Sequence, residues 1–387
     1  MTGLPARSEV VVVGGGVVGL AVAYELARRG RGVLVLDRDD LPGVATRAAA
    51  GMLAPTSEAD LADSTLVQLE LDSLHRYPEF VAGVESLAGR SCGYRTDGTL
   101  WVALNRDQEG DLDRLAAMQR AKGLAASWLS PPGALAREPH LSGRIVAGLL
   151  IDGDHQVDPR ALGAALRTAI AALGGQVVTG YRVSRIEAAG RQALQVSGNA
   201  GGTAFRVAGD VVVLAAGAWS GEVDAPLPPL GLRPVKGQLV RLGGPELLRH
   251  VVRSPDVYLV PRRGGELLLG ATMEEQGLDA LPTAGAVLDL LREAWRILPG
   301  LYDLAVTELS VGFRPAVRDH RPVIGATATH GLYVATGHFR NGVLLAPATA
   351  HYLAEWIAKG AAPTALAPFS VARLEAPAVT TAGVAGR

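Results

Sequence analysis

The sequence predicts an α/β protein in which one parallel sheet is assembled from three distant parts of the chain and an antiparallel sheet is inserted between them. Pieces that alternate strand and helix occupy residues 9–37, 158–217 and 331–359. Hairpin-rich sequence separates these pieces, which is typical of a second, sheet-based domain. The length of 387 residues suits two domains, and 48% hydrophobic residues are enough for sizeable cores.

The first piece is the most informative part of the chain. The apolar run 9–13 breaks at Gly14-Gly15-Gly16-Val17-Val18-Gly19, resumes as an amphipathic helix to Arg29, and ends in a second apolar run, 33–36, followed by Asp37. This order is typical of a dinucleotide-binding unit: a strand, a glycine-rich turn, a helix, a second strand and a terminal acid. The simpler interpretation is a glycine-rich turn in a signal or linker segment, which a chain with 48 glycines could contain by chance.

Each residue type in this motif has a mechanical reason. Gly14 allows the tight turn, Gly16 lets the backbone approach a pyrophosphate, and Gly19 lets the helix lie close to the strand. The pyrophosphate would lie on the N–H groups and the positive dipole end of the helix. Asp37 would accept hydrogen bonds from ribose hydroxyls, which favours FAD or NAD over NADP.

The elements that follow are less regular. Residues 46–55 form a small-residue loop without clear periodicity. Apolar residues at helical spacing predict a helix over 65–77, ended by Pro78, and a further helix over 113–122.

The second piece has clear boundaries. Asp158 is placed to cap a helix whose first residue is Pro159, and Gly174-Gly175 follow its expected last residue, Leu173. The apolar run 211–217 then predicts a buried strand that ends in small residues.

A hairpin and the third piece complete the pattern. Two apolar runs, 257–260 and 266–270, flank Arg263-Gly264-Gly265, which predicts a hairpin. Residues 331–336 predict a strand that leads through a Gly-His-Phe-Arg-Asn-Gly turn into a helix starting near Val343. This turn would provide a second helix N-terminus, which could face the pyrimidine end of a flavin.

Composition excludes several classes of function. A net charge of −1 gives no electrostatic case for binding nucleic acid or an anionic membrane. The single cysteine, Cys92, excludes an intrachain disulfide and a cysteine-based metal site, and no metal is expected. The longest uncharged run, 10–24, is shorter than the ~20 residues needed to span a bilayer. It follows Glu9 rather than a basic cluster, so we expect no secretory signal and a cytoplasmic protein.

The discontinuous sheet distinguishes FAD from NAD better than the glycine motif does, because the nucleotide domain of NAD dehydrogenases is usually contiguous. We therefore expect a Rossmann-like FAD-binding domain of the glutathione-reductase type with an inserted antiparallel-sheet substrate domain. The FAD-binding domain is expected to comprise residues 1–80, 155–222 and 312–368. The substrate domain is expected to comprise 81–154 and 223–311, and 369–387 a disordered tail.

Several motifs together carry a family resemblance. The chain resembles the D-amino-acid oxidase/sarcosine oxidase superfamily, and within it the glycine oxidases of thiamine biosynthesis, over roughly residues 8–360. The motifs are the fingerprint ending in Asp37, the loop 48–55, the segments 257–261 and 270–273, Gly312-Phe313-Arg314-Pro315 with Asp319 and Pro322, and the turn 337–342. The loop and the turn are the most specific of these.

The resemblance implies oxidative deamination of glycine, and also of sarcosine and small D-amino acids. The substrate Cα–H passes as a hydride to the flavin, oxygen becomes hydrogen peroxide, and the imino acid yields glyoxylate and ammonia or enters thiazole synthesis. Hydride transfer needs a deprotonated amine and a fixed carboxylate but no protein base, so no catalytic residue is expected. The family also implies a homo-oligomer, in particular a homotetramer.

Four residues are expected to bind the substrate. Arg314 would clamp its carboxylate with a bidentate guanidinium, and Tyr258 would add a hydroxyl. Met273 would form a pocket wall beside Tyr258 on the adjacent strand, or else fill the core. Arg340 would face substrate or flavin, or else cap a helix.

The resemblance also implies a set of FAD-binding residues, in which Asp37 replaces a more usual glutamate. No cysteine lies near Gly337, so the FAD should be non-covalent, and His338 is expected to position backbone rather than act as a base. The cofactor set is Gly14, Gly16, Val17, Val18, Gly19, Asp37, Arg38, Ala45, Thr46, Ala50, Gly51, Met52, Val183, Gly217, His338, Phe339, Arg340, Asn341, Gly342, Val343 and Leu344.

Other functions remain open from the sequence. One is a D-amino-acid dehydrogenase that passes electrons to a quinone, and another is a sarcosine oxidase. A third is a non-catalytic flavin-binding module, which would not require Arg314 and Tyr258.

Overall fold

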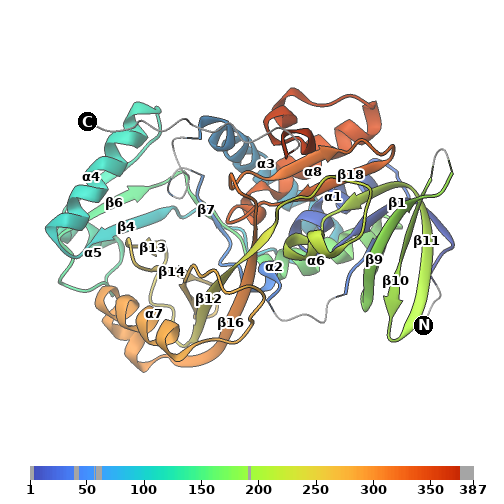
Figure 1. Ribbon diagram of the computed structural model, residues 1–387. Coiled ribbons are helices and arrows are strands. Elements are labelled where there is room, and N and C mark those ends of the chain that lie inside the picture. The colour runs from blue at the N-terminus through green and yellow to red at the C-terminus, as the bar shows by residue number, and fades with distance from the viewer. Residues whose placement is uncertain (1–3, 39–42, 56, 58–62, 191–192, 375–387) are drawn as a thin grey trace, which may run out of the picture.

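The structure, a computed structural model, describes residues 4–38, 43–55, 57, 63–190 and 193–374 (Figure 1). Two large sheets dominate this part of the chain. The mixed α/β fold with two separate sheets confirms the predicted fold class.

The first sheet is parallel at its centre and is assembled from distant segments, as expected. Its strand order is β17-β18-β11-β1-β2-β8, and β9 and β10 extend β11 as an antiparallel ribbon. The bounds are β1 (Arg7–Val13), β2 (Val33–Leu36), β8 (Gln176–Val178), β9 (Tyr181–Ala188), β10 (Leu194–Ala200), β11 (Thr203–Leu214), β17 (Val323–Ala326) and β18 (Leu332–Thr336).

Alternation along β1 decides what covers each face of this sheet. Val10 and Val12 face four helices that share one core, whereas Val11 and Val13 face the β9–β11 ribbon. The helices are α1 (Val17–Arg28), α3 (Ser64–Ala88), α6 (Pro159–Ala172) and α8 (Gly342–Lys359). The sheet is therefore buried on both faces, which explains its continuous valine and leucine runs.

The second sheet is antiparallel except where β13 pairs with β4. Its order is β16-β12-β15-β14-β13-β4-β6-β5, and α7 (Ala284–Ile297) buries Leu290, Ala294 and Ile297 in its core. The strands are β4 (Thr99–Ala103), β5 (Ser127–Leu129), β6 (Ala147–Ile151), β12 (Arg233–Gly243), β13 (Val251–Arg253), β14 (Tyr258–Pro261), β15 (Glu266–Gly270) and β16 (Ala305–Ala316).

Short elements join the two sheets. The helix α2 (Ala45–Ala48) and the strand pair β3 (Met52–Leu53) and β7 (His155–Gln156) lie between them, and α4 (Arg106–Ala121) and α5 (Pro131–Arg137) cover the far end of the second sheet (Figure 1). Four 3₁₀ turns complete the described chain: η1 (Gly217–Glu222), η2 (Pro299–Asp303), η3 (Thr364–Phe369) and η4 (Val371–Leu374).

Most predicted elements are present, with two changes of length. Asp158 caps α6 by accepting hydrogen bonds from the N–H groups of Arg160 and Ala161, as predicted. The helix expected over 113–122 begins earlier, after Asn105, whose side chain caps α4.

The prediction that Pro78 ends its helix is wrong. The helix α3 continues through Pro78 to Ala88, because Val81 and Val84 beyond the proline are buried in the shared helical core. Tertiary packing here outweighs the hydrogen bond lost at proline.

Two of the expected domain boundaries fall inside a single helix or strand. The helix α3 crosses residue 80, and the strand β16 crosses residue 312. Of the expected tail, residues 371–374 form η4, and 375–387 lie outside the described residues.

Candidate active site

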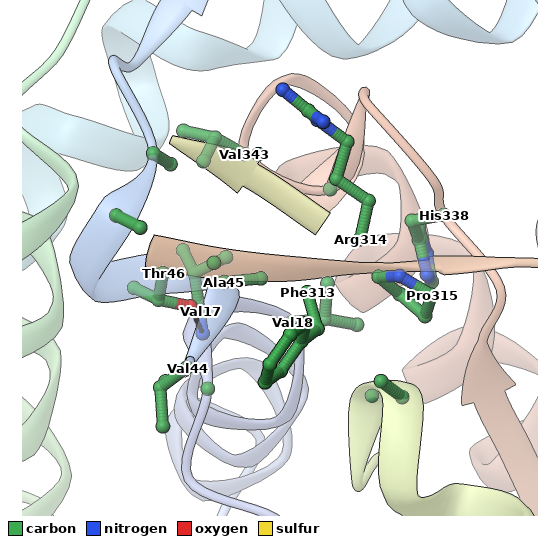
Figure 2. A pocket seen from close by; sticks show the side chains of 18 of the residues that line it. Val17, Val18, Val44, Ala45, Thr46, Phe313, Arg314, Pro315, His338 and Val343 are labelled. Atoms are coloured by element: carbon green, nitrogen blue, oxygen red, sulfur yellow. Dashed lines mark hydrogen bonds between the residues drawn. The ribbon is translucent and has the colours of Figure 1, made fainter. Parts of the chain in front are cut away.

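One cavity of about 470 Å³ lies between the two sheets (Figure 2). Its walls include the carboxyl ends of four parallel strands, at Gly14, Asp37, Ala215 and Thr336. Ligands of open α/β sheets bind at this edge, where helix N-termini and loops converge. The opposite wall is formed by β12, β14 and β16 of the second sheet.

The glycine-rich turn forms a close-fitting cradle at one end of the cavity. Gly14 has φ +112°, and a Cβ there would lie 2.4 Å from the Ala215 carbonyl oxygen. A Cβ at Gly19 would lie 2.0 Å from the Gly14 oxygen, so α1 approaches β1 only because this residue is glycine. At Gly16 the nearest atom to a Cβ would be Thr46 Oγ1 at 3.5 Å, so the space there opens into the cavity.

The first turn of α1 presents donors to this space. Val17 and Val18 line the cavity, and the turn carries no acidic residue. The Val17 N–H donates to Thr46 Oγ1 at 3.0 Å, which ties the helix start to α2. A helix N-terminus of this kind favours an anion such as a pyrophosphate.

The acid at the end of β2 lies beside this cradle. Asp37 Oδ2 accepts a hydrogen bond from Arg167 at 2.9 Å, and the Asp37 side chain is 18% exposed. The neighbouring Arg38 stacks its guanidinium 5.2 Å from the Trp219 ring centroid. Both residues line the cavity, with Val183 of β9 close to the same end.

Most residues expected to hold the cofactor line the cavity. Three do not: Gly19 contacts Gly14, Leu344 is buried in the helical core, and Asn341 donates from Nδ2 to Glu70 Oε1 at 2.5 Å. The expected residues that line it are Gly14, Gly16, Val17, Val18, Asp37, Arg38, Ala45, Thr46, Ala50, Gly51, Met52, Val183, Gly217, His338, Phe339, Arg340, Gly342 and Val343.

The turn before α8 is fixed by buried hydrogen bonds. Phe339 has φ +48° and donates its N–H to the Pro315 carbonyl at 2.9 Å. His338 is 3% exposed, and its Nε2 lies 3.1 Å from Thr349 Oγ1. Burial lowers the pKa of His338 to about 3, which makes this imidazole too weak a base for proton abstraction near neutral pH.

On the second sheet, two glycines leave room for the two residues expected to bind a carboxylate. A Cβ at Gly237 of β12 would lie 2.5 Å from the Arg314 guanidinium, and one at Gly270 of β15 would lie 2.5 Å from the Tyr258 ring. Arg314 of β16 donates to the Thr272 carbonyl oxygen at 3.1 Å. Arg314 and Tyr258 therefore line the same wall, each over a residue without a side chain.

The remaining two expected substrate residues lie at the edge of the cavity. Arg340 lines it and is exposed. The predicted hairpin β14–β15 is present, and in it Tyr258 lies opposite Gly270. The prediction that Met273 lies on the adjacent strand is wrong, because β15 ends at Gly270; Met273 is 67% exposed and lines the rim, so it is not core either.

Sequence reasoning gave no role to Gly237 or to Arg253, a buried arginine that lines the cavity. It included Gly270 and Thr272 in the motif 270–273 but assigned them no supporting role. The place of Gly237 depends on the pairing of β12 with β16, and that of Arg253 on the pairing of β13 with β4, and both pairs join strands that are distant in sequence.

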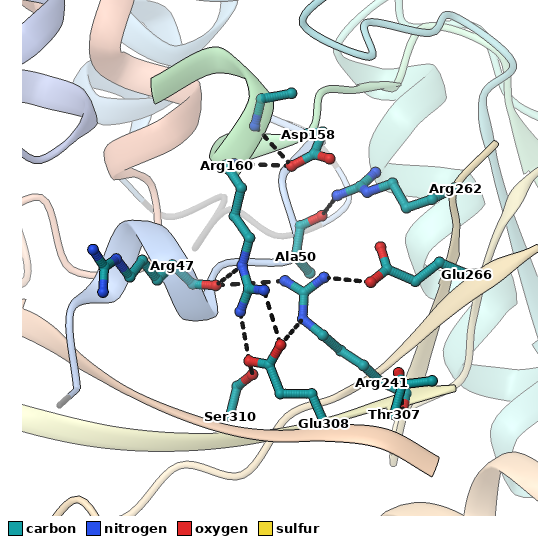
Figure 3. Close-up of polar contacts among 11 residues, drawn as sticks. Arg47, Ala50, Asp158, Arg160, Arg241, Arg262, Glu266, Thr307, Glu308 and Ser310 are labelled. Carbon is teal, nitrogen blue, oxygen red and sulfur yellow. Dashed lines mark hydrogen bonds and ion pairs between the residues drawn. The ribbon is translucent and has the colours of Figure 1, made fainter. Parts of the chain in front are cut away.

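Three arginines bind backbone carbonyl oxygens of the segment 47–50, which joins the two walls (Figure 3). Arg160 Nε and Arg241 donate to the Arg47 carbonyl oxygen at 2.8 and 3.4 Å, and Arg262 donates to the Ala50 carbonyl oxygen. Glu308 of β16 binds Arg160 through both carboxylate oxygens, at 2.6 and 2.9 Å. This hydrogen bonding lowers the pKa of Glu308 to about 2, so the carboxylate is charged near neutral pH.

The residues present fit FAD. The glycine cradle, the α1 N-terminus and Asp37 suit a pyrophosphate and a ribose, and the cavity continues from there to Arg314 and Tyr258. Cys92 does not line the cavity, and burial raises the pKa of its thiol to about 12. Within the described ranges, His, Cys, Asp and Glu side chains form no group of three suited to a metal, and every helix is too short or too polar to cross a membrane.

Comparison with known proteins agrees with this geometry. The chain is 36% identical over 379 residues to the bifunctional protein ThiO/ThiG of Trichormus variabilis, which covers 96% of the chain and 56% of that protein. The chain thus spans about half the length of that relative. It is 34% identical to the glycine oxidase of Geobacillus kaustophilus, over 95% of the chain and 97% of the relative.

The crystal structure of glycine oxidase from Geobacillus kaustophilus has a TM-score of 0.86 to this fold at 33% identity, over 95% of this chain and 99% of the other. A family model described as FAD dependent oxidoreductase (DAO) matches residues 9–356. The chain therefore belongs to this family of FAD-dependent oxidoreductases.

Proposed function

We propose that the chain is an oxidase of glycine, sarcosine and small D-amino acids that acts in the thiazole branch of thiamine biosynthesis. The observation that carries the proposal is one continuous cavity, which joins the glycine cradle at Gly14 to a wall bearing Arg314 and Tyr258. The likeness to glycine oxidase and ThiO/ThiG proteins supports it.

Arg314 and Tyr258 bind and orient the substrate. The Arg314 guanidinium offers a planar fork to the substrate carboxylate, while the Thr272 carbonyl and the space above Gly237 hold that fork in place. The Tyr258 hydroxyl donates to the same carboxylate. Fixing the carboxylate at one end would restrict the orientation of the Cα–H, which shortens the search for a reactive geometry.

The bound flavin supplies the redox chemistry, which is acceptance of a hydride from Cα and transfer of two electrons to oxygen. Amino acid, oxygen and water then give oxo acid, hydrogen peroxide and an amine, which is ammonia from glycine or D-alanine and methylamine from sarcosine. The substrate amine loses its proton to solvent, because neutral, buried His338 does not serve as a base.

Rates of hydrogen peroxide formation, measured across a panel of small amines, test this proposal. We expect purified holoenzyme to form peroxide with glycine, sarcosine and D-alanine. Flavin reduction by these amines without peroxide, restored by a quinone, would instead support a D-amino-acid dehydrogenase. A strong preference for sarcosine would support a sarcosine oxidase, and flavin that stays oxidised with every amine would support a non-catalytic module.

Three further expectations extend the proposal. We propose that acid precipitation releases all flavin as FAD, since Cys92 is remote from the cavity. We propose a cytoplasmic homo-oligomer, with four copies on the family resemblance. We also propose the division into an FAD-binding domain (1–80, 155–222 and 312–368) and a substrate domain (81–154 and 223–311).

A further inference from the structure

Strand β12 carries a fully buried lysine. Lys236 is 0% exposed, and its Nζ donates to Asp279 Oδ2 at 2.9 Å and to the Leu281 carbonyl oxygen at 2.8 Å. Gln276 Oε1 accepts from the same Nζ at 3.5 Å. A buried ammonium is costly unless its charge and its hydrogen bonds are matched. Here one segment, residues 271–283 between β15 and α7, supplies all three acceptors.

This segment is held by polar contacts rather than by apolar packing. None of the residues 271–283 is buried, and the segment contains neither helix nor strand. The backbones of Glu274 and Lys236 exchange two hydrogen bonds, at 2.8 and 3.0 Å. Gln238 of the same strand accepts from the Thr283 N–H at 2.8 Å and donates to Glu274 Oε1 at 2.8 Å. Lys236 and Gln238 therefore hold the segment against β12.

The start of the segment supports the guanidinium proposed to bind the substrate. Arg314 reaches from β16 across Gly237 of β12 and donates to the Thr272 carbonyl oxygen at 3.1 Å. It also donates to the Lys236 carbonyl oxygen at 3.4 Å. Two carbonyl oxygens thus orient the guanidinium, and the position of one of them depends on the segment. A misplacement of about 1 Å at a group of this kind can cost a factor of about 100.

We propose that Lys236 is a positioning residue for substrate binding. Its ammonium holds the segment 271–283 on β12, and the segment in turn holds Arg314 in place for the substrate carboxylate. The inference rests on the proposed function, in which Arg314 binds that carboxylate. The hydrogen bond from Lys236 lowers the pKa of the Asp279 carboxyl, so this carboxylate is charged near neutral pH.

Acetate titration of the FAD-loaded enzyme, followed by the flavin absorption spectrum, measures carboxylate binding without turnover. We expect Lys236→Met, which removes the ammonium but keeps an unbranched side chain, to raise the acetate dissociation constant and the KM for glycine about 10-fold or more. The kcat should change little, because the lost binding is shared by ground state and transition state. The dissociation constant for FAD should keep its wild-type value, because the glycine cradle lies at the other end of the cavity.

Asp279 offers a variant at the exposed end of the same ion pair. Its side chain is 45% exposed, so Asp279→Ala leaves no buried cavity, and it should raise the same two constants several-fold. Asp279→Glu, which keeps the carboxylate, should recover most of the affinity. Glu275→Gln is the matched control, because Glu275 belongs to the same segment but pairs with exposed Arg233, at 3.2 Å. An exposed pair contributes little, so this variant should keep both wild-type constants.

A double variant distinguishes positioning of Arg314 from general support of the fold. If Lys236 acts through Arg314, adding Lys236→Met to Arg314→Ala should change the acetate dissociation constant little, because the two effects are not additive. A full further loss of affinity in the double variant would overturn the inference. Wild-type acetate affinity in both Lys236→Met and Asp279→Ala would also overturn it.

The two proposals fail in distinguishable ways. If the wild type oxidises no amine but binds acetate in a manner that depends on Arg314 and Lys236, the proposed oxidase function fails and the positioning role stands. If glycine is oxidised with the same KM by the wild type, Lys236→Met and Asp279→Ala, the oxidase stands and the positioning role fails.

Discussion

At the scale of single residues, the proposed function makes Arg314 the side chain on which substrate binding should depend most directly. We expect Arg314→Ala to leave FAD bound but to lose the charged clamp, which costs about 3–5 kcal/mol of binding free energy. Anaerobic titration with glycine should then reduce the flavin only at concentrations roughly 100-fold higher or more. Arg318→Ala, which removes an exposed arginine after the same strand, is the control. Unchanged half-saturation in Arg314→Ala would remove this residue from the site.

The buried His338 predicts a pH dependence of stability. Its pKa in the folded protein is about 3, below the ordinary value of 6.5, so the unfolded chain binds more protons between these pH values. Stability is therefore lost as pH falls below about 6.5, by about 1.4 kcal/mol per pH unit from this group. Melting temperatures measured from pH 7.5 to 5.5 should fall more steeply for the wild type than for His338→Asn. Parallel curves would contradict the prediction.

At the scale of elements, glycines in two strands of the second sheet leave space for side chains of neighbouring strands. These are Gly237 of β12, beside Arg314, and Gly270 of β15, beside Tyr258. An alanine at Gly237 would place its Cβ 2.5 Å from the Arg314 guanidinium, a flexible end that moves away without disrupting the strand. We expect Gly237→Ala to raise KM for glycine about 10- to 100-fold, because displacement of about 1 Å is enough for such losses. The melting temperature should change little. Gly163→Ala, in α6 with no atom near its Cβ, should leave KM unchanged.

The helices α3 and α8 are joined by hydrogen bonds that compensate for a proline. Pro347 inside α8 lacks the N–H that would bind the Val343 carbonyl oxygen, and the buried Tyr77 hydroxyl donates to that oxygen at 2.5 Å instead. We expect Tyr77→Phe to cost about 1–3 kcal/mol of stability, because a buried acceptor loses its donor. Chemical denaturation should show this loss but none for Tyr302→Phe, whose side chain is exposed. Equal stability of both variants would contradict this account.

Local elements of this kind were predictable where the signal lies within a few residues. The cap at Asp158, the turn at Gly14 and the hairpin between β14 and β15 all follow from short-range patterns, and the structure contains each of them. The continuation of α3 through Pro78 was not predictable, since it depends on packing against α8, which lies far along the chain. The prediction from local propensity alone therefore made this helix too short.

At the scale of the whole molecule, the sequence predicted a sheet drawn from three segments and an inserted antiparallel sheet, but not the strand order that forms the cavity wall. Arg314 was identifiable from its motif, whereas Gly237 and Arg253 gain their meaning only when β12 and β13 lie within one sheet beside β16 and β14. To predict a cavity between two sheets, one must know the strand order of both sheets. Neither order is contained in local periodicity.

Glu308 links the second sheet to helix α6. This carboxylate of β16 binds Arg160 of α6, and both Arg160 and Arg241 donate to the Arg47 carbonyl oxygen of α2, beside the loop that lines the cavity (Figure 3). Its lowered pKa means that the stability it contributes is present above about pH 4.5 and is lost as pH falls toward 2. Because Glu308 is 40% exposed, the ion pair alone should contribute about 1 kcal/mol or less.

We expect Glu308→Gln to change cofactor binding more than global stability, because the substitution would loosen a segment that lines the cavity proposed to hold FAD. The dissociation constant for FAD, measured by reconstituting the apoenzyme, should rise several-fold, while the melting temperature of the apoenzyme falls by only a few degrees. Glu275→Gln is the matched control, since it removes an exposed carboxylate that pairs with Arg233 on the same sheet at 3.2 Å. A change in FAD affinity shared by both variants would indicate a general effect of charge. An unchanged affinity in Glu308→Gln would mean that the backbone of 44–52 holds its shape without the arginine network.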